Sequence, residues 1–337
     1  MVRPAMDPRP CQAYGFVLVK IDALKFVQGA VSKKDLVPAM AHFVIEGGHV
    51  RAFNGVLAIS SPIDWQFDCA PLAAPMVKAI SYCEDVVSLG LTKTNRLRIE
   101  SGPFKAFIDC VEMEALPHQM PEGVVMDLDG GSLLNAFKAL LPFVGNDASR
   151  PWSNGVLLRD NSAFATNNVC LVEYWLGVEF PFTANLPMAA VAEMIRVGQP
   201  PTHAQLSENS VTFHYADERW IRTQLYSTEW PDLSKILGVS NNVKPVPENL
   251  FEGLEYIKPF VNETSTVYFI DGQLRTHRDD GIGASYQVEG LPDEGVFRLE
   301  MLYKLKDAAT QIDFGTYPAP MVFYGNQLRG VILGMRE

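Results

Sequence analysis

Apolar residues recur with the three- and four-residue spacing of an amphipathic helix at six places along the chain. At each place one apolar residue stands four positions before a basic residue, and a second stands directly before it. This spacing puts the apolar residues on one buried helical face and the basic residue at the solvent edge of that face. The six predicted helices contain residues 21–25, 74–78, 134–138, 192–196, 254–258 and 302–306.

Each predicted helix is followed by short apolar runs that are separated by polar or glycine-rich turns. Such runs predict antiparallel hairpins, as at the Gly47-Gly48 turn that follows the first helix. Each repeat is therefore one helix with three or four strands. The predicted strands are 41–45, 50–59, 87–91, 96–100, 155–158, 163–175, 204–206, 210–215, 266–270, 273–277, 284–288, 311–314, 321–324 and 330–333.

The six basic residues are separated by 53, 60, 58, 62 and 48 positions, so the repeats have similar lengths. One repeat alone is small and has an open sheet edge, which favours pairing of repeats into larger domains. Polar stretches rich in proline and glycine at 117–131 and 231–247 have the composition of domain boundaries. We therefore expect an α+β protein of three similar domains, 1–119, 120–240 and 241–337, each with two helices on antiparallel sheets.

The net charge of the 337-residue chain is −11, from 39 acidic and 28 basic side chains. This balance disfavours a protein that holds DNA by bulk electrostatic attraction. It is compatible with a closed ring, because a ring retains DNA by topology and needs only a thin basic lining. Two copies would supply twelve helices, and basic residues that contact only phosphates read no base sequence.

Other features of the composition narrow the class of protein. No run of eighteen apolar residues predicts a membrane span, and the N-terminus lacks the apolar centre of a signal peptide, so we expect a cytoplasmic protein. The five cysteines form no C-x-x-C pair, which favours reduced, mostly buried thiols and no metal site. No cofactor is expected.

Two other classes of protein stay open. His277-Arg278-Asp279-Asp280 superficially resembles a kinase catalytic loop, but no glycine-rich phosphate loop accompanies it. A hydrolase on this β-rich scaffold would need a concave site that the sequence does not reveal. Short strands and many turns are also compatible with a β-rich viral structural or assembly protein. That class would not explain the six evenly spaced basic residues on the helices.

Three stretches, taken in order, are similar to one known family. They are 24–62, 150–158 with 165–168, and the tail Val331-Ile332-Leu333-Gly334-Met335-Arg336. Over essentially the whole chain the arrangement resembles the bacterial DNA polymerase III β subunit, the sliding clamp. The chain departs from that family at Asn167-Asn168-Val169-Cys170, where Asp, Gly, His and Arg are usual, and at Gly334, where proline is usual. These departures suggest a divergent and phage-encoded clamp.

The resemblance implies a non-enzymatic, head-to-tail homodimeric ring that encircles double-stranded DNA and tethers the replicative polymerase. It also implies a clamp-loader ATPase, and a cytoplasmic location in a bacterial cell or a phage-infected host. Peptides of the polymerase and the loader would dock in a groove at Trp152, Ser153, Thr166, Leu171, Leu237, Val331, Leu333, Met335 and Arg336. The expected DNA-facing residues are Lys25, Lys33, Lys34, Lys78, Lys138, Arg150, Arg196, Lys258 and Lys306.

Overall fold

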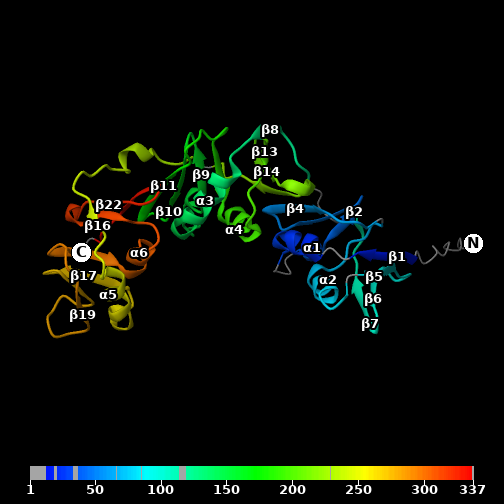
Figure 1. Ribbon diagram of the computed structural model, residues 1–337, viewed down its shortest axis with the longest axis horizontal. Helices are drawn as coiled ribbons and strands as arrows, with labels where there is room; N and C mark the ends of the chain where they lie inside the picture. Colours follow the sequence, from blue (N-terminus) through cyan, green and yellow to red (C-terminus); the bar gives the residue numbers. More distant parts are fainter. Residues whose placement is uncertain are drawn as a thin grey trace, which may run out of the picture. The chain divides into compact units, whose positions relative to one another are not determined.

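The computed structural model describes residues 21–32, 37–65, 67–84, 86–113, 119–227 and 229–335, and the backbone alone of residues 13–18 (Figure 1). In these residues it contains six α-helices and 23 strands, which form four antiparallel sheets. None of the described helices is both long enough and apolar enough to cross a membrane.

The chain divides into two compact units. One consists of 1–130 with 196–224, and the other of 131–195 with 225–337. The predicted middle domain, 120–240, contributes to both units, because their boundary crosses the third and fourth helices. The division into three domains therefore stays a prediction.

All six predicted helices are present. The two apolar residues of the pattern are both buried in the third, fifth and sixth repeats, whereas the second and fourth helices bury the residues one position earlier and leave Ala74 and Ala192 exposed. Every helix buries apolar residues, and the predicted basic residue of every repeat is exposed. In α1, for example, Ala23, Leu24, Phe26 and Val27 are buried whereas Lys25 is exposed. The helices are α1 (Ile21–Val27), α2 (Ala73–Ile80), α3 (Gly130–Leu140), α4 (Met188–Val197), α5 (Leu250–Ile257) and α6 (Leu299–Lys304). Short 3-10 turns are η1 (Gln28–Ala30), η2 (Pro38–Ala41), η4 (Leu141–Phe143), η5 (Pro151–Ser153), η6 (Ala216–Glu218), η7 (Leu233–Lys235), η8 (Lys258–Phe260) and η9 (Phe314–Thr316).

The first unit contains two of the sheets, with helices α1 and α2 packed side by side against them (Figure 1). Its seven-stranded sheet has the order β2-β3-β4-β15-β14-β13-β8 and its four-stranded sheet the order β1-β5-β6-β7. The strands are β1 (Ala13–Leu18), β2 (Val44–Glu46), β3 (His49–Phe53), β4 (Leu57–Pro62), β5 (Val86–Leu91), β6 (Arg96–Ser101), β7 (Phe104–Asp109), β8 (Val124–Asp127), β13 (His203–Leu206), β14 (Ser210–His214) and β15 (Trp220–Gln224).

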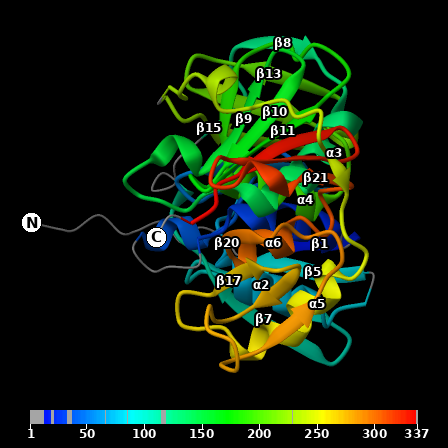
Figure 2. The same cartoon turned by 90° about the vertical axis from the view of Figure 1, so that its left-hand side faces the viewer.

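The second unit is built in the same way, with α5 against β18 and β19, and α6 beside β20 (Figure 2). Its eight-stranded sheet has the order β12-β9-β10-β11-β23-β22-β21-β16 and its four-stranded sheet the order β19-β18-β17-β20. The strands are β9 (Gly155–Arg159), β10 (Ser162–Thr166), β11 (Cys170–Trp175), β12 (Ala184–Pro187), β16 (Lys244–Pro245), β17 (Thr266–Ile270), β18 (Gln273–Arg275), β19 (Ser285–Gln287), β20 (Glu294–Arg298), β21 (Gln311–Asp313), β22 (Met321–Tyr324) and β23 (Leu328–Ile332).

Each of the six repeats is a helix followed by three strands, and successive repeats pair by exchanging a strand. The short strand before a helix joins the first strand of the other repeat: β1 pairs with β5, β8 with β13, β12 with β9, β16 with β21, and β20 with β17. The segment before α2 follows the same rule through an isolated bridge between Ile45 and Cys69. The exchange links repeats one and two, three and four, and five and six.

The two larger sheets arise because the third strands of different repeats pair with each other. We call these pairings joints: β4 pairs with β15 and β11 pairs with β23, both antiparallel. Charged side chains accompany each joint. Arg329 on β23 donates from Nε to Glu173 on β11, the residue opposite it (2.9 Å), and the buried Arg222 on β15 pairs with Glu122. The β11–β23 joint thus combines main-chain hydrogen bonds with an ion pair, whereas the Arg222 pair links β15 to the segment before β8.

Two predictions of long strands were wrong for the same physical reason. Residues 50–59 and 163–175 each form two strands, because an asparagine side chain ends the first one. Asn54 Oδ1 accepts hydrogen bonds from the amides of Val56 (3.1 Å) and Leu57 (2.8 Å), and Asn167 Oδ1 accepts from those of Val169 (3.1 Å) and Cys170 (2.9 Å). Such side-chain bonds replace ladder bonds and turn the chain.

Candidate functional sites

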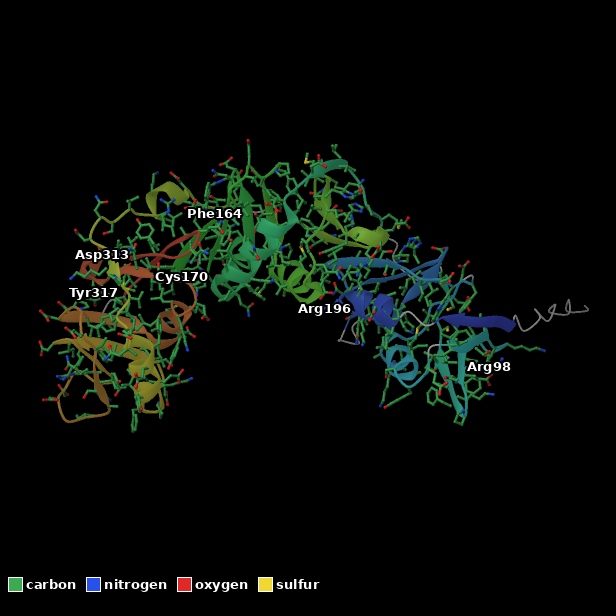
Figure 3. The ribbon with its side chains drawn as sticks, viewed as in Figure 1. Arg98, Phe164, Cys170, Arg196, Asp313 and Tyr317 are labelled. Atoms are coloured by element: carbon green, nitrogen blue, oxygen red, sulfur yellow. The ribbon has the colours of Figure 1, made fainter. Side chains whose placement is uncertain are left out.

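A groove with a volume of about 270 Å³ lies in the second unit beside the β11–β23 joint. Phe164 on β10 and Cys170 on the adjacent strand β11 mark this region in Figure 3. The residues that line the groove come from η5, the β10–β11 turn, the segment after β15 and the end of β23. They are Arg150, Trp152, Thr166, Asn168, Val169, Cys170, Leu171, Pro231, Leu233, Ile236, Val331 and Leu333.

The β10–β11 turn is held by its own side chains. Thr166 Oγ1 donates to the carbonyl oxygen of Cys170 (2.6 Å) and accepts from the amide of Asn168 (3.2 Å). Asn168 has a φ of +68°, in the left-handed region that asparagine tolerates better than most residues. The amide of Leu333 donates to the carbonyl oxygen of Val169 (2.8 Å), which fixes the chain after β23 along the groove.

The floor of the groove is an apolar cluster. Leu171 and Val331 lie opposite each other across the joint, and they pack with Leu157, Phe164, Leu233, Leu237 and Val322. The Cys170 thiol adds to this floor as a neutral group, because burial raises its pKa to about 11. A ligand that covers this surface would bury apolar side chains and gain affinity mainly through the hydrophobic effect.

The rim of the groove is aromatic, with one cation. Trp152 and Trp230 meet edge to face with their ring centroids 5.2 Å apart, and Trp230 packs against the apolar floor. Arg150 is exposed and is the only charged residue among those that line the groove in the described part of the chain. Aromatic anchors beside a single cation suit a short apolar peptide that carries an acidic group.

The structure brings five of the nine predicted groove residues together in the lining of the groove: Trp152, Thr166, Leu171, Val331 and Leu333. Ser153 is buried, with Oγ donating to the carbonyl oxygen of Arg150 (2.9 Å). Leu237 lies beneath the surface in the apolar cluster. Met335 pairs instead with β20, through its amide and the carbonyl oxygen of Val296 (2.8 Å). Arg336 lies outside the described residues.

Sequence reasoning missed the contribution of the segment after β15 to the groove. Pro231, Leu233 and Ile236 line the groove, although their stretch was assigned to a polar linker. A signal was present, because Leu233, Ile236 and Leu237 have the three- and four-residue spacing of a packed helical turn. Asn168, Val169 and Cys170 were noted only as departures from the family pattern.

The predicted DNA-facing residues are mostly exposed and belong to the helices. Lys25, Lys78 and Lys138 are exposed on α1, α2 and α3. Lys258 directly follows α5, Lys306 is the second residue after α6, and both are also exposed. Lys33 and Lys34 lie outside the described residues. Their role in DNA binding stays a prediction.

Two of the predicted DNA-facing arginines have other contacts. Arg196, at the end of α4 (Figure 3), donates from Nη2 to the carbonyl oxygen of Phe26 near the end of α1 (2.9 Å). A cation beside the carboxyl end of a helix is favourable for the helix dipole, so Arg196 also stabilises the packing of α1. Arg150 lines the groove.

The charge around α5 is mixed. Lys258 Nζ lies 3.9 Å from a carboxylate oxygen of Glu255 and 5.2 Å from the centroid of the Tyr303 ring. Burial, followed by the nearby Glu255 charge, raises the pKa of Tyr303 to about 12, so this ring stays neutral. The repeat around α5 therefore offers less free positive charge than those around α1, α2 and α3.

A metal site and a kinase-like catalytic loop are two features that would indicate an enzyme. Within the described residues, no group of three or more His, Cys, Asp or Glu side chains is placed to hold a metal ion. The segment His277-Arg278-Asp279-Asp280 is an exposed hairpin loop, in which Arg278 stacks over the Tyr268 ring at 5.6 Å. Asp280 lies 3.8 Å from Arg275 on the adjacent strand. These contacts are those of a solvated charged loop.

The architecture of paired repeats with shared sheets is that of the DNA clamps. Neither family models nor curated proteins gave a match to this chain. Solved structures do match, and they show that the chain has the fold of the bacterial sliding clamp, the β subunit of DNA polymerase III.

Three of these structures illustrate the likeness. The DnaN sliding clamp of Bartonella birtlesii, solved bound to griselimycin, is 16% identical with a TM-score of 0.81, and the match covers 96% of this chain and 100% of that chain. The Caulobacter crescentus clamp is 17% identical with a TM-score of 0.78, covering 96% and 99% of the two chains. The β subunit of Streptococcus pyogenes is 15% identical with a TM-score of 0.77, covering 96% and 100%.

Proposed function

We propose that the protein is a DNA sliding clamp, a non-enzymatic ring that encircles duplex DNA and tethers the replicative polymerase for processive synthesis. The observation that carries this proposal is the match of 96% of the chain to the clamp fold with a TM-score of 0.81. Exposed lysines on the helices add independent support. The protein would work in the cytoplasm of a bacterial cell or of a phage-infected host.

Three domains, 1–119, 120–240 and 241–337, are the natural division for this function. The exchange of strands links the repeats in three pairs, and each pair falls within one of these ranges. The two larger sheets cross the boundaries between ranges, because β4 pairs with β15 and β11 with β23. The boundary between the two compact units therefore separates the halves of the proposed middle domain, although the strand exchange links its two repeats.

The pairing of third strands also supports a head-to-tail homodimer as part of this proposal. The third strands of four repeats are paired at joints, whereas those of the second and fifth repeats, β7 and β19, end their four-stranded sheets. Pairing of β7 with β19 of a second copy would form a third joint and an eight-stranded sheet like the one in the second unit. Phe107 on β7 is 51% exposed, as expected for a residue that a partner covers.

DNA would be held by phosphate contacts alone. Lys25, Lys78 and Lys138 are exposed at matching positions of three repeats, with no ion pair recorded for them among the described residues. Such contacts are independent of sequence and exchange readily as a ring moves along a duplex. The wider DNA-facing set, including Lys33, Lys34, Arg150, Arg196, Lys258 and Lys306, belongs to the same proposal.

The groove beside the β11–β23 joint is the proposed docking site for peptides of the polymerase and the clamp loader. Its apolar floor and paired tryptophans supply affinity, and Arg150 favours an acidic group on the peptide. The Caulobacter crescentus clamp was solved with PEG at a proposed beta-motif tethering region, and the Bartonella birtlesii clamp with griselimycin. Griselimycin is therefore a suitable probe for this chain.

Topological retention on DNA tests the proposed function. The protein is mixed with nicked circular plasmid, its subunits are joined by a lysine-specific cross-linker, and the complex is washed at high salt. We expect the protein to stay on the circle and to be released when a restriction enzyme linearises the plasmid, because only a closed ring is retained without contacts. Equal retention on linear DNA, or the absence of rings in negative-stain images, would reject the proposal.

Leu333→Asp is expected to weaken griselimycin binding at least about 10-fold, because an apolar anchor is worth about 1.5–3 kcal/mol when buried. Leu333 is 44% exposed, so its replacement leaves the core intact. Tryptophan fluorescence reports binding, since Trp152 lines the groove. The matched control is Val239→Asp, at a 73% exposed residue that does not line the groove. Equal affinity of both variants would place the binding site elsewhere.

A further inference from the structure

Two of the segments that line the groove beside the β11–β23 joint belong to no sheet. The linker segment, residues 231–242, contributes Pro231, Leu233 and Ile236 to the lining, and the tail, residues 333–335, contributes Leu333. Other lining residues lie on β10, β11 and β23, where ladder hydrogen bonds fix the backbone. The positions of the linker segment and the tail must therefore be set by other contacts.

The hydrogen bonds inside the linker segment give it a local shape but do not place it. The amides of Ile236 and Leu237 both donate to the carbonyl oxygen of Leu233 (3.0 Å each). Leu233 and Leu237 are buried in the apolar cluster under the groove. Apolar contacts are not directional, so they hold the segment against the floor without fixing the end where it leaves the groove.

Ser240 fixes that end of the linker segment. Its hydroxyl donates to Oδ2 of Asp313 at the end of β21, and its amide donates to the hydroxyl of Tyr324 on β22 (3.3 Å). The other carboxylate oxygen of Asp313 accepts from the amide of Gly315 (3.0 Å). Because Asp313 is buried, these directional bonds form away from water, where they are strong.

Tyr317 holds the tail in a comparable way. Its hydroxyl donates to the carbonyl oxygen of Met335 (3.1 Å), and the amide of Met335 donates to the carbonyl oxygen of Val296 on β20 (2.8 Å). A Cβ atom at Gly334 would lie 2.7 Å from the Tyr317 ring, so the ring lies directly against the main chain of the tail. Leu333, which lines the groove, is the residue just before this anchored stretch.

Asp313 and Tyr317 flank the same short turn, η9 (Figure 3). The Thr316 hydroxyl donates to the carbonyl oxygen of Asp313 (3.3 Å), and Phe314 is buried edge to face with Phe269, with the ring centroids 5.3 Å apart. Neither Asp313 nor Tyr317 lines the groove. One packed turn thus holds both irregular segments from outside the groove.

We propose that Asp313 and Tyr317 are positioning residues of the groove, with Asp313 acting through Ser240 on the linker segment and Tyr317 acting on the tail. They hold both segments in the peptide-binding arrangement before a peptide arrives, which reduces the entropy lost on binding. Loss of either anchor lowers the fraction of molecules in that arrangement, so the apparent affinity falls although every lining side chain is retained. The inference rests on the docking role proposed above for its ligand, but not for the anchors themselves.

Hydrogen exchange of the full-length protein tests the anchors without any ligand. Ser240→Ala removes one anchor, and Tyr317→Phe removes the hydroxyl of the other while keeping its ring. We expect amide exchange to become about 2- to 10-fold faster in the linker segment of Ser240→Ala and in the tail of Tyr317→Phe, with the other segment unchanged. Ser240→Thr keeps a hydroxyl and should exchange like the unmodified protein. A uniform rise across the second unit, or no rise in the segment that lost its anchor, overturns the proposal.

Griselimycin binding measures the consequence for the groove. We expect binding about 2- to 10-fold weaker in Ser240→Ala and in Tyr317→Phe, with most of the affinity recovered in Ser240→Thr. The matched controls, Ser227→Ala and Tyr268→Phe, change residues outside the groove lining and should bind like the unmodified protein. Equal affinity of the anchor variants and the controls overturns the proposal. If the unmodified protein does not bind griselimycin, the docking role is wrong, and the exchange measurement alone decides whether the anchors position the two segments.

Discussion

Phe107→Pro is expected to weaken the proposed homodimer about 5- to 150-fold while leaving the subunit folded. The Ser101–Phe104 pair closes a two-residue turn, so the amides of Phe104, Ala106 and Ile108 point toward β6. The bond from the amide of Cys110 to the carbonyl oxygen of Asn95 continues this alternation. The amide of Phe107 therefore points to the open edge, where a proline is tolerated.

The proline of the Phe107→Pro variant is unfavourable only when a second copy pairs with β7. Proline removes one donor from the new joint and leaves a facing carbonyl group without a partner, which costs about 1–3 kcal/mol. Sedimentation velocity over a concentration series measures the dimer dissociation constant. Phe107→Leu is the matched control, since it keeps the amide and an apolar side chain. A dimer of unchanged affinity in Phe107→Pro would show that β7 is not the joining strand.

Reversal of three helix charges is expected to remove most of the attraction for duplex DNA. In the triple variant Lys25→Glu, Lys78→Glu and Lys138→Glu, three exposed cations become anions in a chain whose net charge is already −11. Each lysine that neutralises a phosphate contributes about one unit to the slope of log affinity against log salt, so the slope should fall by about three. Fluorescence anisotropy with a short linear duplex, over a series of salt concentrations beginning at low salt, measures this slope.

The matched control reverses three exposed lysines outside the α-helices, Lys93, Lys235 and Lys244. It has the same net charge as the helix variant, so any general repulsion of DNA affects both alike. The helix positions are the DNA-facing ones if the slope falls much further in the first variant than in the control. An equal fall in both variants would assign the effect to net charge alone.

The helices and most hairpins were predictable because their patterns are local. The period of the apolar residues identifies a helical face such as that of α1, and paired left-handed glycines such as Gly47 and Gly48 identify a hairpin turn. The strand β15 was missed because only two of its four buried residues, Trp220 and Ile221, are apolar. Arg222 and Thr223 are buried there, and Arg222 is tolerated because Glu122 and Gln119 bind its guanidinium group.

The groove was only partly predictable for a related reason. Thr166, Leu171, Val331 and Leu333 were assigned through family resemblance, and the structure gathers them at one joint. Leu233 and Ile236 join them because the chain after β15 folds back over β10 and β11, which is a tertiary event with no local signature. Ser153 and Leu237 lie near the groove but support it from below, since sequence position does not indicate the direction of a side chain.

The joints between repeats also explain how a chain 13–17% identical to its structural counterparts keeps their fold. Hydrogen bonds between main-chain groups form for nearly any side chain, provided that the register and the alternation of faces are kept. Selection on such a scaffold preserves the alternation of apolar and polar positions more than the particular amino acid at each position. Amino acids can therefore be exchanged freely at most positions. Evolutionary drift then erases the family signature in the sequence long before it disturbs the architecture.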